Sequence, residues 1–366
     1  MKKFLYAAMA ATVLFASCAK EDNGNGGSKD EAQLTIKLSG VVQSAPGTRA
    51  VEGQGSTAVG TIQLQNGHIF VIDALGVVIE NEALNVGQAT TGGGQIMTNP
   101  VPSDSRVYII GNIPAGDAAT IPTLGTFGAI QTAVSAISSQ TNYRQAALAN
   151  SDGAPAAITV NAGGTTADVN VSIKPLISRM ELVQVKGKAN IKSFDVTGVY
   201  VDSYHPNFTY VGGFNGTMHS QGSSKTFTQI LADGMGDTGT WTATDAATSG
   251  IFIADPQTGA NGDVWAYQVA SGALPRFIIE LDNISYEDAS SAVVTLTGKH
   301  YLTVQSYTGL GSLTFERGKI YRIGATNGIE FDEDDLGTTP NPTDLQLTVE
   351  VSIDEWDLVT PGANLQ

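Results

Sequence analysis

The four histidines of this chain are its first candidates for acid–base or metal chemistry. None of them belongs to a His-x-His, His-x-x-x-His or His-Glu-x-x-His pattern, which would place two ligands together; they are His68, His205, His219 and His300. The chain also lacks a Gly-x-Ser-x-Gly sequence, so no nucleophile with a neighbouring base can be recognised. Gly92-Gly93-Gly94 lacks the lysine of a phosphate-binding loop. The sequence therefore predicts neither an enzyme nor a cofactor.

Four consecutive acids, Asp332-Glu333-Asp334-Asp335, are the candidate for a metal site. Their oxygen atoms are the hard ligands that Ca²⁺ prefers. The run lacks the spaced ligands and central glycine of a helix-loop calcium site, and charge runs are usually solvated. A solvated linker with no metal is the preferred interpretation.

The only cysteine, Cys18, offers a different chemistry. It follows Leu14-Phe15-Ala16-Ser17, and two lysines precede an apolar run from Phe4 to Phe15. That run is too short to span a bilayer and is typical of an export signal. A bacterial signal that ends at a cysteine after Ala-Ser resembles a lipoprotein signal, in which the thiol takes a diacylglyceryl group. Residues 1–18 are therefore expected to be a lipoprotein signal peptide; ordinary secretion with an incidental cysteine is the alternative.

Composition favours a β-rich exported protein. The chain has 366 residues, enough for two ordinary domains, with 42 glycines and only 15% charged residues. With one cysteine, its fold must depend on burial and sheet hydrogen bonds instead of disulfides. The net charge of −16 repels nucleic acid and anionic membrane surfaces. After the signal, no segment reaches the roughly 18 apolar residues of a membrane span.

Short apolar runs bounded by turn residues predict strands along most of the chain. Helical spacing of apolar residues predicts one helix over about 126–139. Pro175 cannot donate to a sheet ladder and marks a seam between two domains, 50–174 and 175–336. The stretch 205–265 is rich in Gly, Ser and Thr and is expected to form loops. The strands are predicted at Ile69–Ile72, Gly76–Ile79, Arg106–Ile110, Ala167–Ile173, Met180–Val185, Phe194–Val201, Phe277–Leu281, Val293–Leu296 and Ile320–Ile323.

Both ends of the chain carry an isolated strand with apolar residues at every second position. The first has Leu34, Ile36 and Leu38, between a polar tether and a loop that contains Gly47-Thr48-Arg49-Ala50. The second follows a Pro-containing hinge at 337–342 and has Leu345, Leu347, Val349, Val351 and Ile353. Either strand can pair within its own monomer, or the last strand can complete the sheet of another copy.

On these features the chain resembles the fimbrillins, the type V pilus subunits of Bacteroidota. The resemblance runs along nearly the whole chain and rests on the order of several motifs. They are the signal ending at Cys18, the acidic tether, the Gly-Thr-Arg-Ala loop, Val107–Asn112, the helix with Ala146–Asn150, Ile173–Arg179, Arg317–Tyr321 and the final strand with Trp356. The resemblance implies two tandem transthyretin-like, Greek-key β-sandwich domains with a short helix in the first.

The resemblance also implies an assembly mechanism. The lipoprotein export machinery would bring a lipid-anchored precursor to the outer membrane, where an Arg-specific surface protease would cut between Arg49 and Ala50. The propeptide 19–49 would leave with its strand, and segment 337–366 of another subunit would fill the groove. The mature form would lie in cell-surface fimbriae made of copies of itself and other fimbrial subunits, supporting adhesion to host or bacterial receptors and biofilm formation.

A monomeric surface lipoprotein that binds glycans for nutrient uptake is the competing hypothesis. In such a protein, exposed aromatic side chains would stack on sugar rings. The candidates for that role are Trp241, Trp265, Tyr204 and Tyr210.

Overall fold

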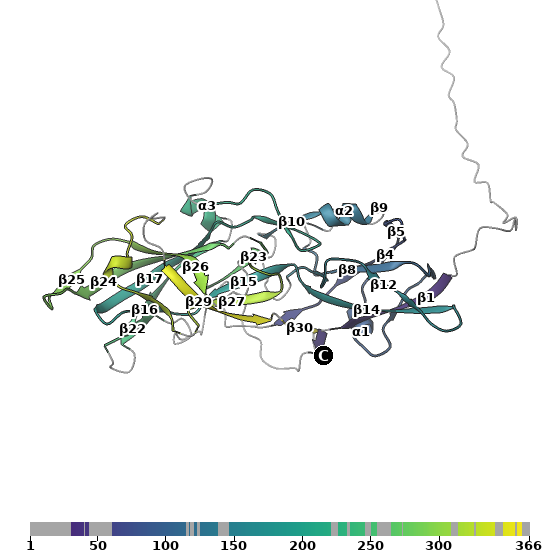
Figure 1. Ribbon diagram of the computed structural model, residues 1–366, viewed down its shortest axis with the longest axis horizontal. Helices are drawn as coiled ribbons and strands as arrows, with labels where there is room; N and C mark the ends of the chain where they lie inside the picture. The colour runs from purple at the N-terminus through teal and green to yellow at the C-terminus, as the bar shows by residue number, and fades with distance from the viewer. Residues whose placement is uncertain are drawn as a thin grey trace, which may run out of the picture.

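The structure is a computed structural model. It describes residues 31–39, 41–43, 61–114, 117, 121–122, 125–137, 146–220, 226–232, 235–245, 250–254, 265–272, 274–308, 314–325, 327–340, 347–355 and 357–360. Two large β-structures lie end to end along the long axis of the molecule (Figure 1). The expected all-β sandwich class is confirmed, since strands dominate both halves and the helices are short.

The N-terminal half is built on an eleven-stranded sheet among the described residues, in the order β6-β1-β14-β11-β8-β4-β5-β9 with β7, β12 and β13 at its margins. Its strands are β1 (Glu31–Ser39), β4 (Gly67–Ile72), β5 (Val77–Ala83), β6 (Gln95–Ile96), β7 (Val101–Pro102), β8 (Arg106–Gly111), β9 (Gly125–Thr126), β11 (Leu148–Asn150), β12 (Ala156–Ala157), β13 (Thr159–Val160) and β14 (Thr166–Pro175). The continuous apolar runs of β4 and β8 form its centre, and each strand is buried on both faces.

The long strand β14 joins two parts of this sheet. Residues 166–172 pair with β1 in parallel, whereas residues 173–175 pair with β11 in antiparallel orientation. Apolar side chains alternate along β14, and Val169, Val171 and Ile173 are buried. Pro175 is its last residue, as expected for a residue without an N–H group.

Helices α1 (Val86–Ala89) and α2 (Phe127–Thr132) belong to this half. The predicted helix is present as α2 and is shorter than expected. The side-chain oxygen of Thr126 caps it, and the chain leaves the helix at Ala133, whose backbone is extended. Strand β10 (Val134–Ala136) follows, so Val134 serves a strand instead of a helix face.

The C-terminal half contains, in its described part, a nine-stranded sheet in the order β20-β17-β24-β26-β29-β27-β15-β23, with β25 on β24. Its strands are β15 (Ile177–Leu182), β17 (Ile191–Asp202), β20 (Gly236–Thr242), β23 (Trp265–Ala270), β24 (Arg276–Glu287), β25 (Val293–Thr295), β26 (His300–Thr308), β27 (Lys319–Ile323) and β29 (Leu347–Glu355). A smaller sheet contains β16 (Val185–Gly187), β21 (Thr244–Asp245), β22 (Phe252–Ala254) and β28 (Ile329–Phe331). Helix α3 (Phe227–Ala232) was not expected, and neither were the strands β20 to β22 within the predicted loop region.

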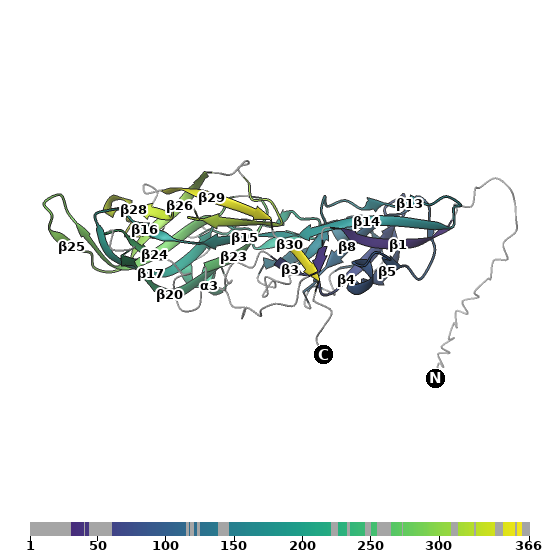
Figure 2. The ribbon, with the colours of Figure 1, turned by 90° about the horizontal axis from the view of Figure 1, so that it is seen from below.

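Two small sheets join segments that are far apart in sequence. In one, β10 pairs with β18 (Asn207–Thr209), which pairs with β19 (Phe214–Asn215). In the other, β30 (Asp357–Thr360) lies between β2 (Val41–Gln43) and β3 (Thr61–Gln63). Figure 2 shows β30 beside β3 at the inner end of the N-terminal half. The domain limits near residue 175 stay a prediction.

No helix in the described part of the chain is long and apolar enough to cross a membrane.

Candidate strand-exchange site

Strand β1, the predicted removable strand, is held by one long ladder and two short ones. It pairs with β14 over seven positions, from Gln33 opposite Thr166 to Ser39 opposite Ser172. On its other side, β6 and β7 each contribute only two residue pairs. Strand β1 is therefore close to being an edge strand, and most of its backbone pairing is with a single neighbour.

The apolar side chains of β1 fill the core of the N-terminal half. Leu34 and Ile36 are fully buried, and Leu38 packs partly buried against the same cluster. In the parallel ladder these three residues lie opposite Ala167, Val169 and Val171, which are all buried as well. The sequence therefore located correctly both the strand and its buried face.

Loss of β1 would leave a groove with a defined chemistry. The edge of β14 would present unpaired N–H and C=O groups over residues 166–172, above an apolar floor. Burying a Leu or Ile side chain contributes about 1.5–3 kcal/mol, and each net ladder hydrogen bond contributes about 1 kcal/mol. An extended segment with apolar residues at every second position is the occupant that this groove fits.

The C-terminal strand β29 lies inside the sheet of its own C-terminal half. Residues 347–350 pair in parallel with β26, and residues 351–355 pair in antiparallel orientation with β27. Val351 is buried. Leu347, Val349 and Ile353 belong to the same strand, and Leu345 lies outside the described residues. In this chain the predicted donor strand is thus paired with two strands of its own C-terminal half.

Three other predicted site residues lie outside the described part of the chain. They are Cys18, Arg49 and Ala50. Residues 44–60, which contain the predicted cleavage point, connect β2 to β3.

The seam between the halves is closed by Arg317, a residue whose role the sequence did not reveal. Its Nη2 donates to the carbonyl oxygens of Asn150 at 2.7 Å and Ser151 at 2.6 Å, and its Nη1 donates to that of Val211 at 3.2 Å. Burial lowers the pKa of the Arg317 guanidinium below its ordinary value. Gly212, at φ +89°, makes room for this side chain, because an added Cβ would lie 2.3 Å from Nη1.

Two tyrosines reinforce the seam beside Arg317. The hydroxyl of Tyr108 on β8 donates to the carbonyl oxygen of Tyr210 at 2.6 Å. The hydroxyl of Tyr210 in turn donates to Asp117 at 3.3 Å. Burial raises the pKa of both phenols, so both stay protonated as donors at neutral pH. In the sequence, only the pair Arg317-Gly318 marks this seam. An arginine next to a glycine is too common a pair to predict such a contact.

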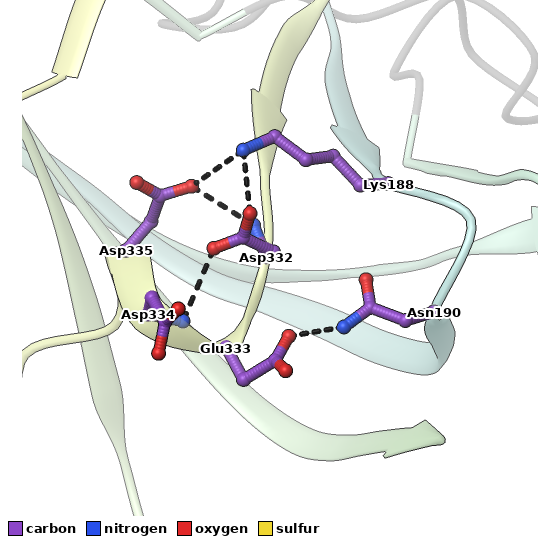
Figure 3. Close-up of polar contacts among 6 residues, drawn as sticks. All are labelled: Lys188, Asn190, Asp332, Glu333, Asp334 and Asp335. Carbon is purple, nitrogen blue, oxygen red and sulfur yellow. Dashed lines mark hydrogen bonds and ion pairs between the residues drawn. The ribbon is translucent and has the colours of Figure 1, made fainter. Parts of the chain in front are cut away.

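The acidic run at 332–335 forms a 3₁₀ turn (Figure 3). Lys188 donates to Asp332 at 2.6 Å and to Asp335 at 3.2 Å, and Asn190 donates to Glu333. Asp332 and Asp335 also form a reciprocal capping box. The carboxylates of Asp332, Glu333 and Asp335 therefore already accept hydrogen bonds from side chains of the same protein. Nowhere in the described residues do three His, Cys, Asp or Glu side chains gather as a metal site would require.

Of the four histidines, His205 and His219 lie near one another, whereas His68 is on β4 and His300 is on β26. His68 lies 3.3 Å from Asn81, His300 lies 3.1 Å from the carbonyl oxygen of Gly298, and His205 stacks on Phe214. Of the aromatic residues named for glycan binding, Trp265, Tyr204 and Tyr210 are buried, and Trp241 stacks half-buried on Trp265. These side chains form no exposed platform for a sugar ring.

Comparison with solved structures identifies the fold. A protein from Bacteroides eggerthii described as a cell adhesion protein aligns with a TM-score of 0.57 at 14% identity, over 92% of this chain and 100% of its own. A fimbrilin from Porphyromonas gingivalis aligns with a TM-score of 0.53 at 11% identity, over 90% of this chain and 99% of its own. This chain has the fimbrillin fold.

A third structure, described as a cell adhesion protein from Parabacteroides distasonis, aligns with a TM-score of 0.51 at 12% identity, over 91% of this chain and 99% of its own. No protein-family model and no curated protein sequence matches the chain. The fimbrillin fold therefore extends over at least 90% of this chain at 11–14% sequence identity. The resemblance read from the motif order is confirmed at the level of the fold.

Proposed function

We propose that this protein is a structural subunit of a surface fimbria, assembled by protease-activated donor-strand exchange and supporting adhesion and biofilm formation. The observation that carries the proposal is the position of β1, which fills the core with Leu34 and Ile36 but depends on β14 for most of its pairing. A cut at Arg49 would convert β1 from a strand of the chain into a bound peptide that can dissociate. The shared fold with a fimbrilin and with cell adhesion proteins supports the same role.

In this proposal each subunit accepts at one end and donates at the other. The precursor is anchored at the outer membrane through lipid on Cys18, and an Arg-specific surface protease frees residues 50–366. The C-terminal strand, with Leu345, Leu347, Val349, Val351 and Ile353, leaves its own half and occupies the β1 groove of the next subunit. This contact joins two different surfaces, head to tail, so each added subunit leaves one free groove and one free strand. Repeating the contact therefore produces a filament.

Digestion of the purified precursor tests the proposal. A chain beginning at Ala19 is treated with an Arg-specific protease and run on a denaturing gel without boiling. We expect cleavage after Arg49 and a heat-sensitive ladder of multimers. Arg49→Lys keeps the charge but removes the cleavage site, so it is expected to stay monomeric. A synthetic peptide of residues 345–360, added in excess during digestion, is expected to fill the groove and shorten the ladder. Complete cleavage that yields only monomers would refute strand exchange.

A further inference from the structure

The last strand, β30, crosses from the C-terminal half to pair with segments of the N-terminal half. Its residues Leu358 and Thr360 lie opposite Val41 and Gln43 of β2. On its other side, Leu358 lies opposite Ile62 of β3. All three strands run parallel, and β30 is the central one. Figure 2 shows β30 beside β3. It follows β29 after a single intervening residue, so the chain passes directly from its own sheet into this contact.

The two partners of β30 lie on opposite sides of the predicted cleavage point. Strand β2 ends at Gln43, β3 begins at Thr61, and Arg49 lies in the connection between them. A cut there places β2 and β3 on separate polypeptides. Strand β2 also follows β1 after a single residue, Gly40. Any event that removes β1 after the cut therefore removes β2 with it.

The two partners differ in how firmly they are attached to the domain. Ile62 of β3 is fully buried, and Leu64 directly after β3 is fully buried as well. Strand β3 therefore stays with the N-terminal core after the cut. Strand β30 would change from a central strand with a ladder on each side to an edge strand with a single short parallel ladder. Parallel pairing is the weaker kind per residue, and an isolated two-stranded pair is marginal in water.

We propose that β30 is a lock that holds the C-terminal donor segment on its own subunit, and that the cut which opens the β1 groove also releases this lock. The inference rests on the proposed processing at Arg49 and adds a regulatory link to it. A subunit would become an acceptor and a donor through the same event, and uncut precursors would be prevented from donating. Because the pairing is mutual, β30 also stabilises β2. A chain without β30 would therefore expose the connection between β2 and β3 to the protease more readily.

Hydrogen exchange of β30 tests the lock directly. The chain from Ala19 is compared before and after treatment with an Arg-specific protease, with Arg49→Lys treated in parallel as the control. We expect amide exchange over residues 357–360 to accelerate on the order of tenfold in the cut chain. Exchange over Ile278–Leu281, in the centre of β24, should stay unchanged. Unchanged protection of 357–360 after peptide 19–49 has dissociated would overturn the proposal.

A reversible cross-link between β30 and β3 supplies a second test. Gln63 and Val359 are register partners, and neighbouring strands lie about 4.8 Å apart, within the range that a disulfide spans. We expect Gln63→Cys/Val359→Cys, after oxidation and cutting, to form no multimers, and reductant to restore the ladder. Val359→Cys alone is the matched control. Normal polymerisation of the oxidised double variant would refute the lock.

These outcomes separate the lock from the function on which it rests. If strand exchange itself were wrong, the unmodified cut chain would form no ladder in either redox state, yet exchange at 357–360 would still accelerate. If only the lock were wrong, the unmodified cut chain would form the ladder, exchange at 357–360 would stay as slow as in the uncut chain, and the oxidised double variant would polymerise like the unmodified chain.

Discussion

Nη2 of Arg317, just before β27, lies 2.7 Å from the carbonyl oxygen of Asn150 on β11, so that one side chain links the two halves of the molecule. The same nitrogen reaches Ser151, and Nη1 reaches Val211. Asn150 in turn uses its side-chain amide within the N-terminal sheet, accepting from the backbone of Ile109 and donating to that of Val107. The seam is therefore bonded into the core of the N-terminal sheet.

Removing the guanidinium should weaken the molecule as a whole. Arg317→Met keeps an apolar stem but removes the donor of three hydrogen bonds, one of them buried and two half-buried. A hydrogen bond from a charged group contributes about 1.5–3 kcal/mol, so we expect the free energy of unfolding to fall by about 2 kcal/mol or more. Urea denaturation followed by fluorescence measures the change. Arg106→Met, at an exposed site on β8, is the matched control and should stay within about 0.5 kcal/mol of the parent. Equal stability of both variants would show that the hydrogen bonds of Arg317 do not stabilise the protein.

The space beside Arg317 can be tested by adding one carbon atom. Gly212→Ala introduces a Cβ that would lie 2.3 Å from Nη1 and 2.5 Å from Cδ of Arg317, in a left-handed backbone conformation. The conformation alone costs roughly 1–2 kcal/mol, and the clash adds to it. Gly164→Ala, at φ +76° with nothing within 4 Å of the added Cβ, isolates the backbone cost. Thermal unfolding should therefore show a larger loss for Gly212→Ala. A loss no larger than that of Gly164→Ala would mean that Arg317 adjusts freely.

Truncating the buried face of β1 should speed its release. Leu34→Ala removes a fully buried side chain, and such changes cost about 2–5 kcal/mol. After cleavage that cost falls on the bound peptide, so peptide 19–49 should dissociate at least tenfold faster, as measured by gel filtration with mass spectrometry. Lys37→Ala, at a half-buried position of the same strand, is the control. Equal release rates for the two variants would show that the apolar face does not hold the strand.

The ion pair between Lys188 and Asp332 predicts a small dependence of stability on pH. Hydrogen bonding and the charge of Lys188 lower the pKa of Asp332, so its contribution is present above the ordinary pKa of an aspartate and is lost as pH falls through the lowered value. The hydrogen bond to Asp332 raises the pKa of Lys188, whose contribution is present at neutral pH and is lost only in strong alkali. Both side chains are partly exposed, at 45% and 27%, so solvent screening limits the pair to about 1 kcal/mol or less. Lys188→Met should lose this amount at pH 7 and less at pH 2, as measured by urea denaturation. An equal loss at both pH values would assign the effect to packing.

Local patterns were sufficient to predict many of the strands. Alternating apolar and polar residues located β1 and β14, because successive side chains of a strand point to opposite faces. Continuous apolar runs located β4 and β8, which are buried on both faces. The turn Asp73-Ala74-Leu75 also follows from local chemistry: the Asp73 carboxylate accepts from the backbone of Leu75 and Val77, and Gly76 takes φ +82°. These features depend only on neighbours along the chain.

The sequence by itself therefore determined the all-β class, many of the strands and the apolar faces of both terminal strands. Only the tertiary structure decided which strand pairs with which. A strand with apolar residues on one face fits any exposed sheet edge, so the pattern of β29 could not show that it lies between β26 and β27. Nor could the sequence show that β30 lies between β2 and β3, or that Arg317 donates to carbonyl groups more than a hundred residues away. Those pairings are fixed by the packing of the whole chain, in which each contact depends on many others.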